Sequence, residues 1–356
     1  EEDESGDGED WRVLRANGVN SEIVASGDAD QVVVALRYPI LRALNGKPGS
    51  FALEDVVYVP YSRLLHTPAT VQEGERYLDD LVRTVFDRLR ADAVRSRAYP
   101  DRLLADVVDP AMVKAIAAIE HMDASALEKD PKVTLERFFV TLGGNQGDSY
   151  NYARSSASAL GLVQFIPSTY NRLAARTEWG LDADFERGMR SHENAVRAQA
   201  IYLDTLLTEF PESVRQTFLA DPLTASEYIV AAYNGGSGRV RRAIASWPQI
   251  FTGERTRTLQ SLQKQYDAAF AKAESLRQKT LAEKDKKKRA ALQKQLDAQR
   301  VVYRGLKAKV DALQASLLRQ ETIGYVEKYR LTRADERFLP RASLTAVPVS
   351  TRAVLE

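Results

Sequence analysis

Residues 109–122, DPAMVKAIAAIEHM, predict a buried helix that ends at an acid. Asp109 is a residue type that caps helices, and Pro110 is tolerated in a first helical turn. Apolar side chains follow at helical spacing: Met112, Val113, Ile116, Ala117 and Ile119. Glu120 comes at the C-terminal end, where the helix dipole and the apolar face both disfavour a charged carboxylate. A carboxyl group kept protonated in this way is a candidate general acid, although a glutamate at a helix end is more often a solvated side chain.

The composition describes a globular protein without a dominant charge. The 356 residues are 44% hydrophobic, which suits two domains and an appendage. Lysine and arginine number 50 against 49 acidic residues, so the overall charge does not favour a nucleic acid as partner. The absence of cysteine excludes thiol nucleophiles and disulfides, and the three histidines, His66, His121 and His192, are not spaced as metal ligands. We therefore expect neither a metal nor a cofactor.

The ends of the chain and its hydropathy bear on location. No run of about 18 apolar residues occurs, so no segment is predicted to span a membrane. The first residues, EEDESGDGED, contain neither an initiator methionine nor the apolar part of a signal peptide. We expect a mature chain whose signal peptide has been removed, with residues 1–10 as a disordered acidic tail.

Residues 11–98 predict a small α/β module. β-Branched runs such as SEIVAS and EDVVYVPY alternate with turn signals such as NGKPG at 45–49. An amphipathic helix follows over residues 69–98, and Thr67 before Pro68 is a plausible cap. No motif of known chemistry lies in this module, and packing or targeting is its simplest role.

Residues 99–253 predict a mainly helical domain with several motifs. We expect a polar, irregular loop over residues 122–155, with a short helix at 135–142. The segment ALGLVQFIPSTY at 159–170 has a glycine that permits close approach, an amide, and a proline that begins a helix. ENAVRAQAIYLDTLL at 193–207 continues as helix, and AAYNGGSGRV at 231–240 ends one helix and begins another.

Residues 254–320 predict an antiparallel helical hairpin inserted into this domain. Two coiled-coil-like arms, each about 40 Å long at 1.5 Å per residue, flank AEKDKKKRA, which lacks an apolar anchor. Their apolar stripes are Leu259, Leu262, Tyr266, Ala269, Ala273 and Leu276, then Leu292, Leu296, Val302, Leu306, Val310, Leu313 and Leu317. A single straight helix is the alternative. Residues 321–335 predict a helix that rejoins the domain, and residues 336–356 an extended tail.

Taken in order, Glu120 and the motifs at 159–170, 193–207 and 231–240 resemble the soluble lytic transglycosylase (SLT) type of the lytic transglycosylase family. A fifth match, ETIGYV at 321–326, is similar to a helix that follows the AYN motif closely in that family; here the hairpin separates them. The resemblance implies a lysozyme-like fold and covers residues 109–245 and 321–330. With the residue patterns above, it gives a mainly α protein with an inserted hairpin and a small α/β N-terminal module.

The resemblance also implies roles for individual residues. Glu120 falls on the position of the acid and base, and Tyr233 on a tyrosine whose hydroxyl approaches that carboxylate, with Asn234 beside it. The positions of the family's GLMQ segment hold Gly161, Leu162, Val163 and Gln164, with Val163 in place of the usual methionine. His121 and Asp123 depart from the family, which has a serine after the glutamate and an aromatic residue two positions further on.

The reaction implied is cleavage of the β-1,4 bond between N-acetylmuramic acid and N-acetylglucosamine, with formation of a 1,6-anhydro ring. It requires one carboxylate, whereas a hydrolase normally requires two. Asp123 or Asp148 is a possible second carboxylate, which would make the protein a hydrolysing muramidase. A further alternative is a weakly active, glycan-binding scaffold. We expect peptidoglycan as substrate, a possible protein partner at the hairpin, no nucleic acid, and export to the cell envelope, in particular the periplasm.

Overall fold

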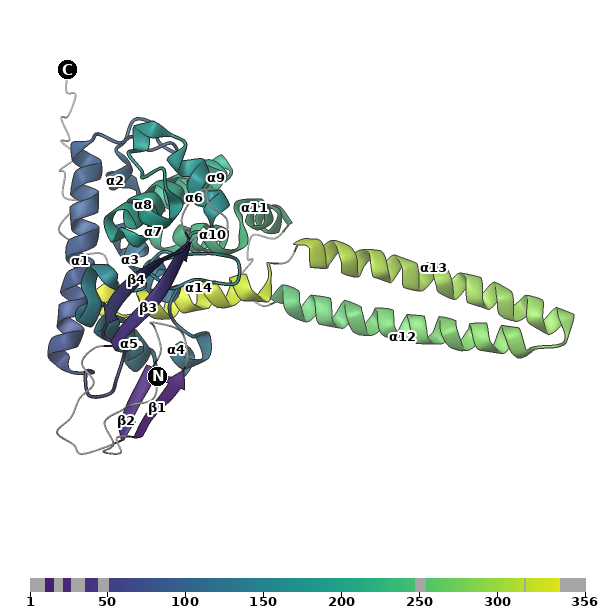
Figure 1. Ribbon diagram of the computed structural model, residues 1–356. Helices are drawn as coiled ribbons and strands as arrows, with labels where there is room; N and C mark the ends of the chain where they lie inside the picture. Colours follow the sequence, from purple (N-terminus) through teal and green to yellow (C-terminus); the bar gives the residue numbers. More distant parts are fainter. Residues whose placement is uncertain are drawn as a thin grey trace, which may run out of the picture. The chain divides into compact units, whose positions relative to one another are not determined.

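The computed structural model describes residues 10–15, 22–26, 36–43, 51–246, 254–316 and 318–339 (Figure 1). It is mainly helical, as the sequence predicted. The chain divides into two compact units. The first comprises Glu1–Thr208, Glu212–Glu227 and Tyr325–Glu356, and the second Glu209–Pro211 and Tyr228–Gly324.

The strands lie in the N-terminal part of the first unit and form two antiparallel pairs. β1 (Asp10–Arg15) pairs with β2 (Glu22–Ser26), and β3 (Leu36–Ala43) pairs with β4 (Phe51–Tyr58). In the second pair the register is continuous, from Leu36 opposite Tyr58 to Ala43 opposite Phe51. At the end of β4, Val56 and Tyr58 are buried and pack against Tyr152. A separate module over residues 11–98 stays a prediction.

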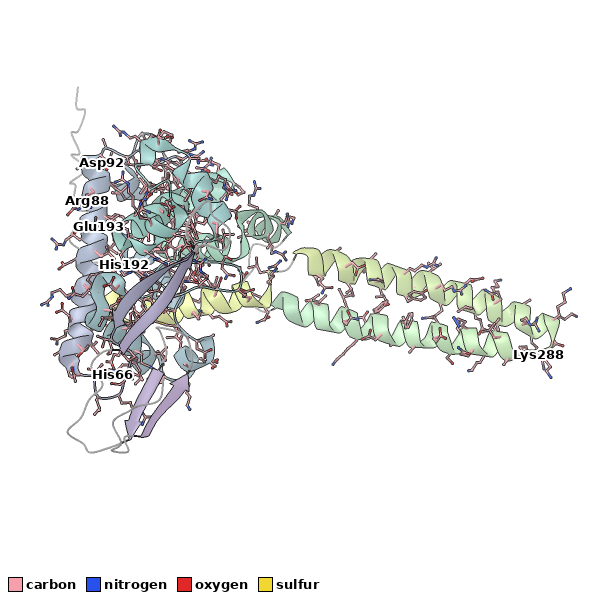
Figure 2. The ribbon with its side chains drawn as sticks, viewed as in Figure 1. His66, Arg88, Asp92, His192, Glu193 and Lys288 are labelled. Atoms are coloured by element: carbon pink, nitrogen blue, oxygen red, sulfur yellow. The ribbon has the colours of Figure 1, made fainter. Side chains whose placement is uncertain are left out.

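The helix α1 (Pro68–Ala91) begins at Thr67, whose hydroxyl accepts a hydrogen bond from the Thr70 amide at 3.2 Å. Its buried face, which includes Leu78, Leu81, Val82, Val85, Phe86 and Leu89, packs against the later helices α3, α5 and α8. Ion pairs join α1 to α8 (His192–Thr208): Arg88 with Glu193, and Arg197 with Asp92, the residue that caps α1, at 2.6 Å (Figure 2). The domain boundary predicted at residue 98 also stays a prediction.

The helix α3 (Pro110–Ile119) is the most deeply buried element of the first unit. Asp109 caps it by accepting a hydrogen bond from the Ala111 amide at 2.8 Å, and Pro110 begins it, as predicted. Every residue from Ala111 to Ile119 is buried. Lys114 is buried too, and its ammonium donates to Asp79 at 2.6 Å and to the Arg337 carbonyl at 2.9 Å. Glu120 follows as the C-terminal cap, so the core itself positions the end of this helix.

The irregular loop predicted over residues 122–155 is wrong, because most of this stretch is helical: α4 (Ala124–Lys129) and α5 (Pro131–Asn145), followed by the short 3₁₀ helix η1 (Gln146–Asp148). The short helix predicted at 135–142 lies within α5. Asp123 and Asp130 cap these helices by accepting hydrogen bonds from the Ala126 and Val133 amides, at 2.9 and 3.1 Å. Two aspartates and a first-turn proline are helix-start signals, which the polar composition of the stretch concealed.

The remaining helices of the first unit cover the core around α8. They are α2 (Leu104–Val107), α6 (Pro167–Ala174), α7 (Phe185–Arg190) and α9 (Glu212–Ala220), with the 3₁₀ helices η2 (Thr177–Trp179) and η3 (Glu336–Phe338). Two further helices, α10 (Pro222–Gly235) and α14 (Gln320–Arg333), have residues in both units. Within the first unit, the Tyr329 hydroxyl lies 3.0 Å from the Ser226 hydroxyl, and Arg330 pairs with Glu227 at 2.6 Å.

The second unit contains α11 (Ser237–Ser246) and two long helices, α12 (Glu254–Ala282) and α13 (Lys286–Ser316). Figure 1 shows α12 and α13 side by side, joined by residues 283–285, and Figure 2 labels Lys288 at their turn. Ala269, Ala273, Leu296 and Val310 are buried between them, and the Gln299 amide donates to the Ala269 carbonyl at 3.1 Å. Val302, predicted for the same stripe, is 51% exposed, because it lies outside this seam; Leu317 lies outside the described residues.

Candidate active site

A cavity of about 390 Å³ lies at the C-terminal end of α3, within the first unit. Glu120, His121 and Asp123 line it from the end of that helix. One face of α5 supplies Thr134, Arg137, Phe138 and Thr141, at the spacing of adjacent helical turns. The end of β4 supplies Tyr58 and the segment after it supplies Tyr61, and the loop after η1 supplies Tyr150, Ala153, Arg154, Ser155 and Gln164.

Glu120 is half-buried and lines this cavity. Its Oε1 accepts a hydrogen bond from the hydroxyl of the buried Tyr325 at 2.6 Å. The bond joins the end of α3 to α14, across more than 200 residues of sequence. A short hydrogen bond from a buried hydroxyl fixes the carboxyl group in one orientation.

Lys328 lies one turn of α14 beyond Tyr325 and reaches the same helix end. Its ammonium donates to the carbonyls of Ile119 and Met122, at 2.5 and 3.0 Å. Burial lowers the pKa of Lys328, while the nearby charges of Glu120 and Asp123 raise it. The carbonyls at the end of α3 thus have a cation as partner, which opposes the negative end of the helix dipole and attracts a carboxylate at Glu120.

His121, directly after Glu120, forms a fixed part of the cavity wall. Its ring stacks on Tyr150 with centroids 3.8 Å apart, and its Nε2 lies 2.9 Å from the Leu162 carbonyl. A carbonyl can only accept, so Nε2 carries a hydrogen. Burial lowers the pKa of His121 to about 3, so the ring is neutral near pH 7. These contacts are those of a packing residue rather than of a catalytic base.

The segment that holds Gly161 and Gln164 turns tightly beside the cavity. Gly161 has φ +78°, and a Cβ there would lie 2.4 Å from the Met189 carbonyl oxygen, so only glycine fits. Gln164 also has a positive φ, and its amide donates to the Ala153 and Gly161 carbonyls, at 2.9 and 2.8 Å. Leu162 and Val163 are fully buried. Of the four predicted residues in this segment, Gln164 therefore lines the cavity, and the other three shape the turn that presents it.

The two possible second carboxylates lie in different places. Asp123 is exposed and lines the cavity with Glu120, but it also caps α4 and accepts a hydrogen bond from the Ser125 hydroxyl at 2.5 Å. Asp148 is exposed in η1 and is not part of the cavity wall. Its charge acts instead on Tyr77, whose pKa is raised to about 12, mainly by burial.

Tyr233 and Asn234 end α10 in the second unit. Asn234 Oδ1 accepts a hydrogen bond from the Thr322 hydroxyl at 2.9 Å, and a Cβ at Gly235 would lie 2.5 Å from that same hydroxyl oxygen. The end of the AYNG motif and Thr322, near the start of the ETIGYV motif, are therefore in contact within this unit, although α12 and α13 separate them in sequence.

Reasoning from sequence missed several residues of the site. Tyr325 and Lys328 belong to the helix that begins with ETIGYV; the motif was recognised, but its tyrosine was not connected to Glu120. Tyr58, Tyr61 and Arg137 carried no motif. Arg137 and Thr141 lie one turn apart within the helix predicted at 135–142, and this spacing was the signal available for them.

The first unit thus places a half-buried glutamate at a helix end beside a cavity, a position that suits a general acid. Residues 148–249 match the family model of the Transglycosylase SLT domain. This stretch is thus an SLT domain, of the lysozyme-like lytic transglycosylase family, which confirms the resemblance. Such a domain indicates a transglycosylase that acts on peptidoglycan. Glu120 precedes the matched stretch and Tyr325 follows it. Comparisons with curated proteins and with solved structures gave no significant match.

The described ranges also bear on metal binding and on membrane insertion. Among these residues, no group of three or more His, Asp or Glu side chains is placed to hold a metal ion. Within the same residues, none of the helices combines the length and the apolar character needed to cross a membrane.

Proposed function

We propose that the protein is a lytic transglycosylase that cleaves the β-1,4 bond between N-acetylmuramic acid and N-acetylglucosamine and leaves a 1,6-anhydro ring. The observation that carries the proposal is the Glu120 carboxyl group, which lines a cavity, is oriented by Tyr325, and accompanies an SLT domain in the same chain. Peptidoglycan strands are the substrate.

In the first step, protonated Glu120 donates its proton to the glycosidic oxygen as the bond to the muramic anomeric carbon breaks. Glu120 is then a carboxylate. In the second step it removes the proton from the 6-hydroxyl of the same muramic residue, whose oxygen bonds to the anomeric carbon. Glu120 ends the cycle protonated, and no water is consumed, so a single carboxyl group suffices.

Tyr325 and Lys328 are placed to stabilise the negative charge that Glu120 acquires during this cycle. Glycan that fills the cavity displaces water from Glu120 and favours its protonated form at the start. When Glu120 loses its proton, the Tyr325 hydroxyl donates to the new carboxylate, and the Lys328 ammonium at the helix end attracts it. Both groups are in place before reaction, which is how fixed donors stabilise a developing charge.

The other predicted residues have supporting roles in this proposal. Gln164 presents its side chain to the glycan, while Gly161, Leu162 and Val163 hold the turn behind it. Tyr233 and Asn234 contribute to substrate binding at the end of α10. The helices α12 and α13 are an insertion that offers a surface to a protein partner, and the substrate places the protein in the cell envelope.

Asp123 is the remaining argument for a hydrolase, because it lines the same cavity as Glu120. Its oxygen already accepts hydrogen bonds from the Ala126 amide and the Ser125 hydroxyl. An aspartate engaged as a helix cap is better suited to holding α4 than to activating water. This difference favours the transglycosylase over the hydrolase.

Digestion of purified sacculi, with the products weighed by mass spectrometry, tests the proposal. We expect 1,6-anhydromuramic ends from the wild type, none from Glu120→Gln, and anhydro ends in reduced yield from Asp123→Asn. Reducing muramic ends that disappear in Asp123→Asn would establish the hydrolase instead. Cleavage that persists unchanged in Glu120→Gln would remove Glu120 from the mechanism.

A further inference from the structure

The wall of the cavity contains a segment from outside the matched SLT stretch. Tyr58 ends β4 and Tyr61 follows it, whereas the family match begins at residue 148. Tyr58 is 1% exposed and is therefore almost inaccessible to solvent, whereas Tyr61 is half-buried and is more accessible from the cavity. The N-terminal part of the chain thus shapes the space beside Glu120.

Two sets of polar contacts hold this segment on α5. Asn145 clamps the backbone of Val59: its Oδ1 accepts from the Val59 amide at 2.7 Å, and its Nδ2 donates to the Val59 carbonyl at 2.9 Å. The Tyr61 hydroxyl lies 2.9 Å from Nδ1 of His66, and Nε2 of His66 lies 3.0 Å from the Glu136 carboxylate. Tyr61 is therefore connected to Glu136 of α5 through His66, and these hydrogen bonds fix its position.

Arg137 completes this part of the wall. Its guanidinium carbon lies 4.5 Å from the centroid of the Tyr61 ring, a stacking distance, and the side chain is half-buried. Because stacking on a fixed ring orients the planar guanidinium, Arg137 is placed to recognise a planar anion.

We propose that Tyr61 and Arg137 form a subsite for a carboxylate of the peptide stem carried by muramic acid. The inference rests on the proposed function and adds a specificity-determining residue to it. The negative charge of Asp123 and the positive charge of Arg137 line the same cavity, so a stem carboxylate is directed towards Arg137. A bidentate pair with the guanidinium, beside an aromatic ring, selects strands with stems over bare strands.

The test compares glycan strands that carry peptide stems with strands whose stems an amidase has removed. Binding is measured in the Glu120→Gln background, so that no strand is cleaved, and cleavage is measured in the otherwise wild-type chain. Arg137→Gln removes the charge, and Arg137→Lys keeps the charge without the planar fork. Arg63→Gln, an exposed change in the same segment that does not line the cavity, is the matched control. Thermal melting confirms that each variant is folded.

We expect Arg137→Gln to weaken binding and kcat/KM for stem-bearing strands about tenfold or more, as loss of a charged hydrogen-bonded pair does. Bare strands should be unaffected, Arg137→Lys should fall between, and Arg63→Gln should match its parent. An equal loss on both kinds of strand, or no loss on either, overturns the subsite.

Failure of the proposed function would give a different result from failure of the subsite. Absence of anhydro products from the wild type would refute the transglycosylase while leaving the binding comparison intact. In that case, a stem preference that disappears in Arg137→Gln still supports the subsite, and its persistence overturns it.

Discussion

The helix α3 and the pair α12 and α13 use apolar residues in different ways. In α3, Met112 and Ile116 have no exposed surface, and every neighbour from Ala111 to Ile119 is buried. In the pair, Phe270 is 46% exposed and Val301 is 72% exposed, and burial is confined to one seam. A helix that is surrounded on every side is held by tertiary packing, whereas α12 and α13 depend on one contact surface and on helix propensity.

The difference bears on function. Glu120 ends the helix that is packed on all sides, so its position is determined by the core and does not depend on the helix alone. The exposed apolar side chains of α12 and α13 bury little of their surface and contribute little to folding. We therefore expect substitutions in α3 to affect the whole first unit, and substitutions in the pair to remain local.

The largest contrast is expected between two truncations of apolar side chains. Ile116→Ala in α3 should lower the free energy of unfolding by about 2–5 kcal/mol, because it leaves a cavity in a rigid core. Phe270→Ala in α12 should cost less than about 1 kcal/mol at its half-exposed site. Urea unfolding, followed by circular dichroism, measures both. Similar losses for the two variants would mean that α12 is packed as closely as α3.

The second contrast concerns pH, because all three histidines lie in the first unit. His192 is buried; its Nε2 lies 2.7 Å from the Ser149 carbonyl, and its Nδ1 lies 2.8 Å from the Tyr77 hydroxyl. Burial lowers the pKa of His192 from 6.5 to about 4. The unfolded chain therefore binds the extra proton first as the pH falls, and folding stability is complete above about pH 6.5 and declines between pH 6.5 and 4.

At about 1.4 kcal/mol per pKa unit, His192 alone should account for about 3 kcal/mol across this window. Unfolding free energies measured from pH 4 to 7 check the slope. His192→Gln should reduce it, even though the variant is less stable at pH 7. The second unit has no histidine and should show no such slope. An unchanged slope in the variant would assign the pH dependence to other groups.

The third contrast separates activity from folding. Tyr325→Phe removes the hydroxyl that donates to Glu120, and a hydrogen bond to a charged group is worth about 1.5–3 kcal/mol, or roughly 10–100-fold in rate. Tyr303→Phe, in α13, is the matched control: its ring contacts Phe270, so removal of the hydroxyl should leave turnover unchanged. Release of anhydromuropeptides measures both. Full activity in Tyr325→Phe would mean that the hydroxyl does not orient the acid.

The sequence predicted best where one signal is local. Asp109, Pro110 and the apolar spacing placed α3 and its end at Glu120, because caps and periodicity act within a few residues. The same kind of signal is present at Asp123, Asp130 and Pro131, but the polar composition of the stretch concealed it, so α4 was missed and only residues 135–142 of α5 were predicted.

The remainder of the site depends on long-range contacts that no local pattern encodes. Tyr325 reaches Glu120 from another helix, and Lys328 caps α3 from that same helix. The Tyr61 and Arg137 pair joins two segments that share no motif. These contacts follow from how helices pack, which periodicity does not determine. The roles of Tyr233 and Asn234 stay predictions.

The smallest expected effect has the opposite sign. Gly305 lies inside α13 with no atom within 4 Å of the Cβ that a larger residue would add, so an alanine meets no obstacle. Glycine in a helix interior costs about 0.5–1 kcal/mol relative to alanine, because the unfolded chain has more backbone freedom to lose. Gly305→Ala should therefore stabilise the second unit by about that amount, as urea unfolding would measure. Gly161→Ala, which meets the Met189 carbonyl, should instead destabilise the first unit. A loss of stability in Gly305→Ala would mean that α13 requires a flexible backbone at residue 305. Helix propensity would then not be what stabilises α13.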